Sequence, residues 1–308
     1  MESAFDLVVV GEGVAGLTCA GEAAALGLRV ASIESEFQGG LVMNIVELEG
    51  YEAAGGLSGM DHAMSLAASN RKAGVRSVSA PATAVRPVAG GFEVDTGAGR
   101  FAGRAVVLAT GARLRKLGVP GEEDFRGRGV SHCADCDAPM FTAADVVVAG
   151  GGDSAFQEAL VLAGECAVVH IVFDGAQPTA HARFRQAAAG HAAIRLWPGR
   201  RVAEVLGDSS GMTGVRLAGT EGGPGEVLPC AGLFTYIGLE PNASIAPPDV
   251  RRDAGGALVT DGEFRTALPF LWAIGQVRAG FGGRLHDAEA EGRSVARRIR
   301  EAIAASTG

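Results

Sequence analysis

The sequence predicts an α/β protein made of two parallel-sheet units, with the second unit inserted into the first. Three observations support this fold class. Two apolar strand patterns, Leu7–Val10 and Asp145–Ala149, each lead into a glycine-rich turn. An alanine-rich helical pattern follows each turn, and a further apolar strand that ends in a carboxylate follows each helix. Strands that alternate with helices in this way favour βαβ units and a parallel sheet.

The first unit begins with the turn Gly11–Gly16, whose sequence is G-E-G-V-A-G. A helical pattern runs through Ala25, and the strand Leu28–Ile33 leads to Glu34, which follows Gly11 by 34 − 11 = 23 residues. Glycines at this spacing let N–H groups at a helix start approach a pyrophosphate, and the carboxylate suits a ribose diol. This Rossmann-like pattern predicts that a dinucleotide is bound by Gly11, Gly13, Val14, Ala15, Gly16 and Glu34.

The same pattern returns at the turn Gly150–Ala155, with sequence G-G-G-D-S-A. A helical pattern continues to about Ala163, and the strand Ala167–Phe173 leads to Asp174, which follows Gly150 by 174 − 150 = 24 residues. One glycine fingerprint is a weak signal, but two in register predict at least one bound dinucleotide. The candidate residues of this unit are Gly150, Gly152, Asp153, Ser154, Ala155 and Asp174.

Two cysteines, Cys133 and Cys136, stand between the glycine turns, and Asp137 follows them directly. Such a pair can close a small disulfide or hold a reactive thiolate where a helix begins. Thiol–disulfide exchange needs a thiolate, a proton donor and a second thiol that resolves the mixed disulfide. The alternative is half of a zinc site, but the sequence has no second C-x-x-C or His pair to complete it. We therefore expect redox chemistry and no metal here, and an ordinary loop position for His132.

Further apolar runs predict the remaining strands and one long helix. Short antiparallel strands are expected within 84–94 and at 100–101, and a buried strand at 104–111. A further apolar run covers 233–238, and a strand that ends in a glycine turn is expected at 270–276. A last helix should run to about Ala305, with a solvated basic face over Arg293–Arg300. The segment Gly118–Glu122 predicts a hinge. These elements suggest an outer domain of residues 1–114 and 237–308 and an inserted domain of residues 115–236.

Length, composition and charge exclude several classes of protein for this chain. The chain of 308 residues suits two domains, and its 47% hydrophobic and 20% charged residues indicate a globular protein. A net charge of −8 argues against a nucleic-acid partner. An acidic start and the absence of long apolar runs argue against a signal peptide or membrane span, which leaves the cytoplasm. The single cysteines Cys19, Cys166 and Cys230 are expected to be buried and inert.

Together these motifs resemble the low-molecular-weight thioredoxin reductase family over essentially the whole chain. The resemblance rests on Gly11–Gly16, Glu34, Gly39-Gly40, Ala109–Ala112, Gly118–Glu122, Cys133–Asp137, Gly150–Ala155, Ile237-Gly238, Pro241-Asn242 and Ala273–Gly275. It implies FAD in the first unit, a nicotinamide nucleotide in the second, and a homodimer. It also implies a disulfide that passes electrons from the flavin to a protein substrate.

The resemblance also assigns roles by position. Cys136 would face the flavin ring, Cys133 would attack the substrate disulfide, and Asp137 would protonate the leaving thiolate. The family's aspartate after the last strand, which contacts the flavin side chain, is here Gln276, and glutamine keeps an acceptor oxygen. The family's Gly-Gly-Gln-Leu is here Gly39–Val42, which changes polar contacts near the flavin without removing the cofactor. The further FAD positions implied are Gly40, Thr110, Gly111, Gly275 and Gln276.

The chain departs from the family at the end of its second nucleotide strand. Where the family has the His-Arg-Arg run that binds the 2′-phosphate of NADPH, this chain has Val172, Phe173 and Asp174. A phosphate dianion beside a carboxylate is strongly disfavoured without a cation, so the sequence argues against NADPH. Asp174 suits the free 2′-hydroxyl of NADH, or is simply an exposed turn residue. A reshaped loop would be needed to bring Arg183 and Arg185 to the phosphate.

Three functions stay open at this point. The leading one is an FAD-dependent dithiol/disulfide oxidoreductase with an atypical donor, NADH or ferredoxin, acting on a thioredoxin-like protein or a small disulfide. The second is a dithiol oxidase, in which a small dithiol reduces the disulfide and oxygen takes the electrons. The third is a non-enzymatic flavin-binding redox sensor. Related oxidases usually have His-Gly after the cysteine pair, so Asp137–Pro139 favours a reductase. The acid beside two thiols argues against a sensor.

Overall fold

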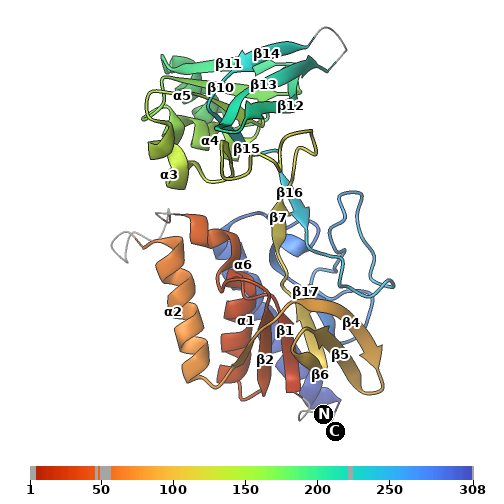
Figure 1. The fold of residues 1–308 in the computed structure, drawn as a ribbon. Helices are drawn as coiled ribbons and strands as arrows, with labels where there is room; N and C mark the ends of the chain where they lie inside the picture. The colour runs from red at the N-terminus through yellow and green to blue at the C-terminus, as the bar shows by residue number, and fades with distance from the viewer. Residues whose placement is uncertain (1–4, 46–47, 49–56, 221–224, 307–308) are drawn as a thin grey trace. The chain divides into compact units, whose positions relative to one another are not determined.

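The computed structural model describes residues 5–45, 48, 57–220 and 225–306. The chain divides into two compact units (Figure 1): unit 1 is Met1–Arg113 with Glu240–Gly308, and unit 2 is Leu114–Leu239. The chain passes between the units twice. The two connecting segments pair as a two-stranded sheet formed by β7 (Ala112–Leu114) and β16 (Leu239–Pro241). Each unit has its own sheet and core, which confirms the predicted α/β class with two Rossmann-like sheets.

Unit 1 is built on a seven-stranded sheet in the order β3-β2-β1-β6-β5-β4, with β17 also beside β6. The pairs β1–β2, β1–β6, β2–β3 and β6–β17 are parallel, whereas β4 and β5 form an antiparallel hairpin against the first half of β6. Their bounds are β1 Phe5–Val10, β2 Val30–Glu34, β3 Arg76–Ser79, β4 Ala82–Val88, β5 Gly91–Thr96, β6 Gly99–Leu108 and β17 Leu271–Ala273.

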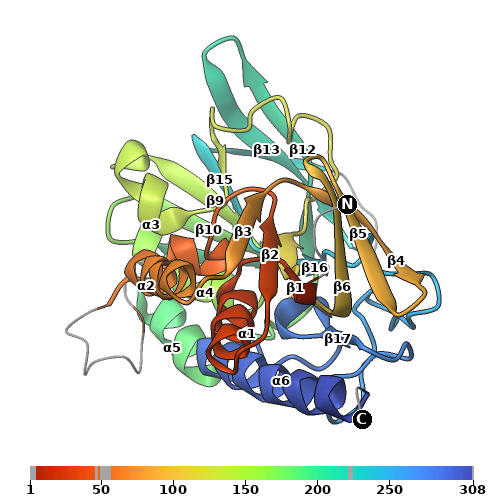
Figure 2. The same cartoon turned by 90° about the horizontal axis from the view of Figure 1, so that it is seen from below.

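Three helices of unit 1, α1 (Val14–Ala25), α2 (Gly59–Lys72) and α6 (Leu285–Ala305), pack together, with α1 beside both others (Figures 1 and 2). Their apolar side chains share one core with the odd-numbered residues of β1, since alternate residues of a strand face opposite sides. The close approach of α6 to α1 requires a glycine at 292, because a Cβ there would lie 2.7 Å from the Ala15 carbonyl oxygen. The described part of this unit also contains two short 3-10 helices, η1 Gly40–Asn44 and η4 Gly275–Val277.

Unit 2 has a five-stranded parallel sheet in the order β11-β10-β9-β15-β8 and an antiparallel three-stranded sheet in the order β12-β13-β14. Val146 and Val148 of β9 pack against the helices, while Val147 and Ala149 pack against the three-stranded sheet. The bounds are β8 Val130–Ser131, α3 Ala134–Asp137, η3 Ala138–Phe141, β9 Asp145–Ala149, α4 Asp153–Leu162, β10 Val168–Phe173, α5 Ala182–Gly190, β11 Ile194–Pro198, β12 Arg200–Asp208, β13 Gly211–Gly219, β14 Glu226–Pro229 and β15 Gly232–Thr235.

Two expectations need correction. The strands expected at 100–101 and 104–111 are one strand, β6, which ends at Leu108. Its first half pairs antiparallel with β5 and its second half pairs parallel with β1. The segment Gly118–Glu122, expected to act as a hinge, is hydrogen bonded within unit 2. The buried Glu122 carboxylate accepts the N–H groups of Leu117 and Gly118 at 2.9 and 2.7 Å, and Val205 donates to the Pro120 carbonyl. The chain instead leaves and re-enters unit 1 at residues 113–114 and 239–240.

Candidate redox site and nucleotide turns

The Cys133–Cys136 pair is closed as a disulfide at the start of the short helix α3 in unit 2. Cys133 is the residue that precedes the helix, and its Sγ accepts the N–H of Cys136 at 3.3 Å. Cys136 is exposed and Cys133 is half-buried. One backbone N–H, that of Cys136, thus reaches the Cys133 sulfur, and a backbone donor of this kind stabilises a thiolate.

Asp137 is held beside the disulfide by Ser131, a residue that the sequence reasoning did not select. The buried Ser131 hydroxyl donates to Asp137 Oδ2 at 2.6 Å and accepts the N–H of Cys133 at 3.1 Å. The Asp137 N–H in turn donates to the Cys133 carbonyl at 3.1 Å. The predicted trio of two thiols and one carboxyl group is therefore fixed in a single hydrogen-bonded turn. Nothing in the sequence marks Ser131 as part of the site, and only the structure shows its contacts. It is the last residue of strand β8.

Tyr236 and Glu158 form a second support for the disulfide, and both were missed. The Ala134 N–H, the first of helix α3, donates to the Tyr236 hydroxyl at 3.0 Å, and this hydroxyl donates to Glu158 Oε2 at 3.3 Å. Burial raises the pKa of Glu158, and the charge of Asp135 raises it further. Burial likewise raises the pKa of Tyr236, so its hydroxyl stays protonated. The sequence offered one signal: Tyr236 directly follows the last strand of this sheet.

Neither His132 nor the three single cysteines are expected to take part in thiol exchange. Burial lowers the pKa of His132, whose Nδ1 lies 2.6 Å from the Thr235 hydroxyl, so a loop role fits it. The three single cysteines are buried free thiols, as predicted. Burial raises the pKa of Cys19 to about 12, that of Cys166 to about 11 and that of Cys230 to about 12. Thiols with such pKa values are poor nucleophiles at neutral pH.

The first glycine turn of unit 1 has the shape that a pyrophosphate needs. Gly11 adopts φ +102°, and a Cβ there would lie 2.3 Å from the Ala109 carbonyl oxygen. A Cβ on Gly16 would lie 1.9 Å from the Gly11 carbonyl oxygen, so only glycine permits this turn. Gly13 precedes helix α1, and no side chain in the described part of the protein caps the first turn of that helix, Val14–Gly16. Its N–H groups suit a phosphate, and these residues fit FAD.

The other predicted FAD residues converge on this turn. A Cβ on Gly40 would lie 3.5 Å from the Gly13 Cα, and one on Gly275 would lie 3.1 Å from the Ala15 Cβ. The half-buried Gln276 follows Gly275. Thr110, whose N lies 2.9 Å from the Cβ position of Gly11, also donates its hydroxyl to the Asn242 carbonyl at 2.7 Å, and Asn242 donates its N–H to the Gly111 carbonyl. The structure thus brings together residues from five separate segments around the start of α1.

Glu34 turns its carboxylate toward the same turn, where Oε2 accepts the Glu12 N–H at 2.8 Å. Glu12 is the more unusual feature, because this acidic residue is only 1% exposed. Its oxygens accept from Ser32 Oγ at 2.5 Å, Ser77 Oγ at 2.7 Å and Gln38 Nε2 at 2.5 Å. Glu12 therefore ties strands β2 and β3 and the loop before Gly40 to the glycine turn. The only indication of this role in the sequence was that Glu12 lies within the glycine turn Gly11–Gly16.

Replacing Glu12 with alanine should weaken FAD binding by roughly tenfold or more, because each buried donor left without an acceptor costs about 1–3 kcal/mol. Glu12→Gln, which retains one acceptor oxygen, should lose less. The dissociation constant of FAD, measured by recovery of flavin fluorescence on release, checks this order. Glu36→Ala, an exposed carboxylate in the neighbouring loop, is the matched control. Equal FAD affinity in wild type and Glu12→Ala would show that the network does not shape the turn.

The second glycine turn, in unit 2, has the same backbone form but different surroundings. Gly150 adopts φ +144°, and a Cβ there would lie 2.3 Å from the Tyr236 carbonyl oxygen. The loop after β10 folds onto the turn, since the Gly151 carbonyl accepts the N–H groups of Thr179 and Ala180 at 2.8 and 3.0 Å. The glycine contacts expected of a nucleotide turn are thus present, and a loop of the same chain lies against them.

Two carboxylates, Asp153 and Asp174, lie at this second turn, and His181 and Arg183 lie near the first of them. Asp153, the first residue of α4, accepts the His181 N–H at 2.6 Å and also contacts the His181 ring. These hydrogen bonds lower the pKa of Asp153, so it stays ionised. Asp174 is exposed directly after β10, Ser154 is exposed and Ala155 is buried against Gly150. Of the two arginines beyond the loop, Arg183 stacks over the Phe184 ring at 4.5 Å.

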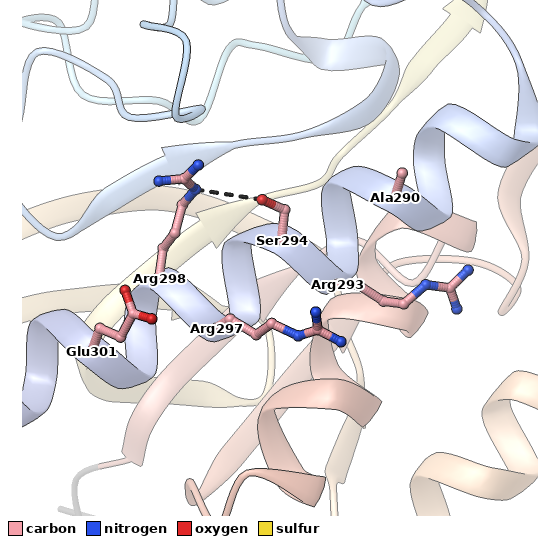
Figure 3. Close-up of a pocket in the computed structure, with 6 residues that line it drawn as sticks. All are labelled: Ala290, Arg293, Ser294, Arg297, Arg298 and Glu301. Carbon is pink, nitrogen blue, oxygen red and sulfur yellow. Dashed lines mark hydrogen bonds between the residues drawn. The ribbon is translucent and has the colours of Figure 1, made fainter.

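The basic face of α6 borders a surface groove of about 480 Å³ (Figure 3). Its three arginines are paired with acids: Arg293 with Glu289, Arg297 with Glu22, and Arg298 with Glu263. The groove is therefore a solvated, ion-paired helix face, as predicted. Among the described residues there is no group of three or more potential metal ligands, and none of the described helices has the length and apolar character to cross a membrane.

Comparison with known proteins gives consistent matches over the whole chain. A family model described as pyridine nucleotide-disulphide oxidoreductase matches residues 5–306. The chain is 35% identical over 280 residues to the thioredoxin reductase of Treponema pallidum, covering 91% of each protein. The crystal structure of Lactococcus lactis thioredoxin reductase matches with a TM-score of 0.90 at 29% identity, covering 98% of this chain and 99% of that one. That of T. acidophilum thioredoxin reductase matches with a TM-score of 0.88 at 27% identity, covering 98% and 100%.

Proposed function

This chain belongs to the pyridine nucleotide-disulphide oxidoreductase family, in its low-molecular-weight thioredoxin reductase group, and we propose that it exchanges electrons between FAD and a disulfide partner without drawing them from NADPH. It is thus a flavoenzyme of the disulfide oxidoreductase class. We assign FAD to the outer domain, residues 1–114 and 237–308, and the redox disulfide to the inserted domain, residues 115–236. The observation that carries the thiol chemistry is the disulfide at the start of α3 with Asp137 held beside it by Ser131.

FAD, when bound, supplies the electron pair that opens the Cys133–Cys136 disulfide. The remaining steps belong to the residues of the chain. The Cys133 thiolate attacks a sulfur of the partner disulfide, so a Cys133–partner bond forms and the partner's other sulfur leaves as a thiolate. Asp137 donates the proton that this leaving thiolate takes up. The Cys136 thiolate then attacks Cys133, which restores the internal disulfide and releases the second partner thiol.

The surroundings of the second glycine turn support a donor other than NADPH. The 2′-phosphate would meet the exposed Asp174, and the pyrophosphate would meet the ionised Asp153 at the helix start. The Asp174 carboxylate disfavours a 2′-phosphate, which NADH lacks. Asp153 is paired with His181 and lies near Arg183, so it does not distinguish between the two nucleotides. Within this proposal NADH, ferredoxin and a substrate dithiol are the remaining electron sources, and NADH would use Asp174 for its 2′-hydroxyl.

The donor is testable by anaerobic titration of the yellow holoprotein, followed by loss of flavin absorbance. We expect dithiothreitol to bleach the flavin through the Cys133–Cys136 pair and micromolar NADPH to leave it oxidised. Reduction by NADH but not NADPH would identify NADH as the donor. Rapid bleaching by micromolar NADPH would contradict the argument from Asp174. A flavin that no dithiol reduces would contradict the assignment of the redox pair.

The partner and setting follow from the same chemistry. We propose a thioredoxin-like protein as the disulfide partner, because the named relatives are thioredoxin reductases. A homodimer and a cytoplasmic location belong to this proposal, the latter because three cysteines remain free thiols. The second candidate function is a dithiol oxidase, which shares every thiol residue but runs in reverse with oxygen as acceptor. It is favoured by the same acidic second turn, and stoichiometric oxygen uptake on addition of a dithiol would distinguish it.

A further inference from the structure

The chain of hydrogen bonds from Ala134 to Tyr236 to Glu158 lies directly behind the redox disulfide. We propose that Tyr236 and Glu158 are positioning residues that make the Cys133–Cys136 disulfide harder to reduce, by keeping the Ala134 N–H bonded to the Tyr236 hydroxyl and away from sulfur. This inference rests on the proposed function only in taking the disulfide as the reactive group.

The first step concerns the backbone donors of α3. A thiolate at a helix start is stabilised by the N–H groups of the first turn. Here the Cys133 sulfur accepts a hydrogen bond from the Cys136 N–H at 3.3 Å. The Ala134 N–H instead donates to the Tyr236 hydroxyl, at 3.0 Å. Ala134 is fully buried, so water does not compete for this donor. One of the donors that would favour the reduced, ionised form is therefore committed elsewhere.

The second step concerns the rigidity of Tyr236. Its N–H donates to the Ala149 carbonyl at 2.8 Å, and its own carbonyl oxygen lies 2.3 Å from the Cβ position of Gly150. Its hydroxyl donates in turn to Glu158 on α4. The backbone contacts and the Glu158 carboxylate therefore hold the hydroxyl oxygen with its acceptor lone pairs toward Ala134. A freely rotating hydroxyl would not hold the donor in this way.

The third step concerns charge. Three acids belong to this region: Asp135 and Asp137 on α3, and Glu158 on α4, which accepts from the Tyr236 hydroxyl. His132, the residue after β8, is the nearby titratable base. Burial lowers the pKa of His132, so it adds no positive charge at neutral pH. The negative charge of Asp135, which also raises the pKa of Glu158, disfavours a thiolate on this turn and so favours the disulfide form. The hydrogen bond and the charges act in the same direction, toward a strongly reducing dithiol.

The test compares the wild-type holoprotein with Tyr236→Phe, which keeps the ring and removes only the hydroxyl. The protein is equilibrated with reduced and oxidised dithiothreitol, and the Cys133 and Cys136 peptides are quantified by alkylation and mass spectrometry. In this exchange one dithiothreitol loses two electrons and two protons and closes its ring, while the protein disulfide gains them. The second readout is the alkylation rate of Cys133 as a function of pH, which gives the apparent thiol pKa.

Tyr236→Phe should shift the exchange constant roughly tenfold toward the protein dithiol, since a hydrogen bond to a charged sulfur becomes available. That change corresponds to about 30 mV toward less negative potential for a two-electron couple. The alkylation profile should move to lower pH. Glu158→Gln, which keeps an acceptor for the hydroxyl, should shift both readouts in the same direction but less. Glu226→Gln on the exposed strand β14 is the matched control and should match wild type.

Two outcomes overturn the inference. An unchanged or raised thiol pKa in Tyr236→Phe would show that the tyrosine only stabilises the fold, because a structural role alone does not lower that pKa. A larger shift in Glu158→Gln than in Tyr236→Phe would show that charge acts without the withheld N–H. Failure of wild type to exchange with dithiothreitol at all would instead contradict the proposed function, so the two failures are distinguishable.

Discussion

Replacing either Cys133 or Cys136 with serine will lower kcat/KM for reduction of a disulfide partner by on the order of a thousandfold or more, as removal of a nucleophile does in other enzymes. Serine retains the size of the side chain but cannot form the disulfide that the structure shows. Without Cys133 the mixed disulfide cannot form, and without Cys136 it cannot be resolved. The measurement is the rate of thiol release from the partner with a dithiol as electron source, so that the identity of the natural donor does not enter.

The two substitutions should differ in what they trap. Cys136→Ser leaves Cys133 without its resolving thiol, so a covalent complex with the partner should accumulate under non-reducing conditions. Cys133→Ser should trap much less if Cys133 is the attacking residue. Cys166→Ala, at a buried thiol whose pKa is raised to about 11, is the control and should keep its activity. Trapping by Cys133→Ser alone would reverse the assigned roles of the two cysteines.

Replacing Glu291 with alanine will lower the free energy of unfolding of unit 1 by about 3–5 kcal/mol, because it leaves a buried arginine charge without its partner. The Glu291 and Arg278 side chains are only 6% and 14% exposed. Arg278 donates to Glu291 through both Nε, at 3.1 Å, and a terminal nitrogen, while its guanidinium stacks over Phe264 at 5.1 Å. Glu291 Oε2 also accepts the Gly275 N–H at 2.8 Å. Chemical denaturation of the variant measures the loss.

Two further variants distinguish the contribution of the Arg278–Glu291 ion pair from that of side-chain packing. Glu263→Ala breaks the more exposed pair with Arg298 on the same helix α6, and it should cost no more than about 1 kcal/mol. The double variant Arg278→Met with Glu291→Met removes both charges, so it should recover much of the lost stability. Because Gly275 lies at the predicted FAD site, Glu291→Ala should also weaken FAD binding. A loss in Glu291→Ala no larger than that in Glu263→Ala would contradict the buried pair.

The parts of this molecule that could be predicted from the sequence are those whose chemistry is local. Glycine turns need glycine at Gly11 and Gly150 because of backbone contacts within one βαβ unit, and the spacing to Glu34 and Asp174 follows from helix and strand lengths. The cysteine pair and Asp137 are neighbours in the chain, so their proximity needed no fold. The strand boundaries of β9 coincide with its apolar run for the same reason.

The parts that could not be predicted depend on contacts between distant segments. Tyr236 lies 102 residues from Ala134, and Ser77 lies 65 residues from Glu12, yet both pairs are hydrogen bonded. Nothing in the local pattern around Glu12 or Glu291 distinguishes a buried charge from a solvated one, because the partners come from other elements. The sequence predicts two strands where the structure has the single strand β6. The two halves of β6 pair with different neighbours, one antiparallel and one parallel. Pairing partners are a property of the sheet, and one strand's sequence does not contain them.

The burial of the three single cysteines has a consequence for a protein whose work is sulfur exchange. With pKa values of about 11 to 12, fewer than roughly one in ten thousand of these thiols is ionised at neutral pH. A partner disulfide therefore meets only one reactive couple on this polypeptide, and scrambled cross-links with the interior do not form. The same shielding protects these sulfurs from peroxide, so oxidation of cysteine should be confined to Cys133 and Cys136, where a dithiol can reduce a sulfenic acid.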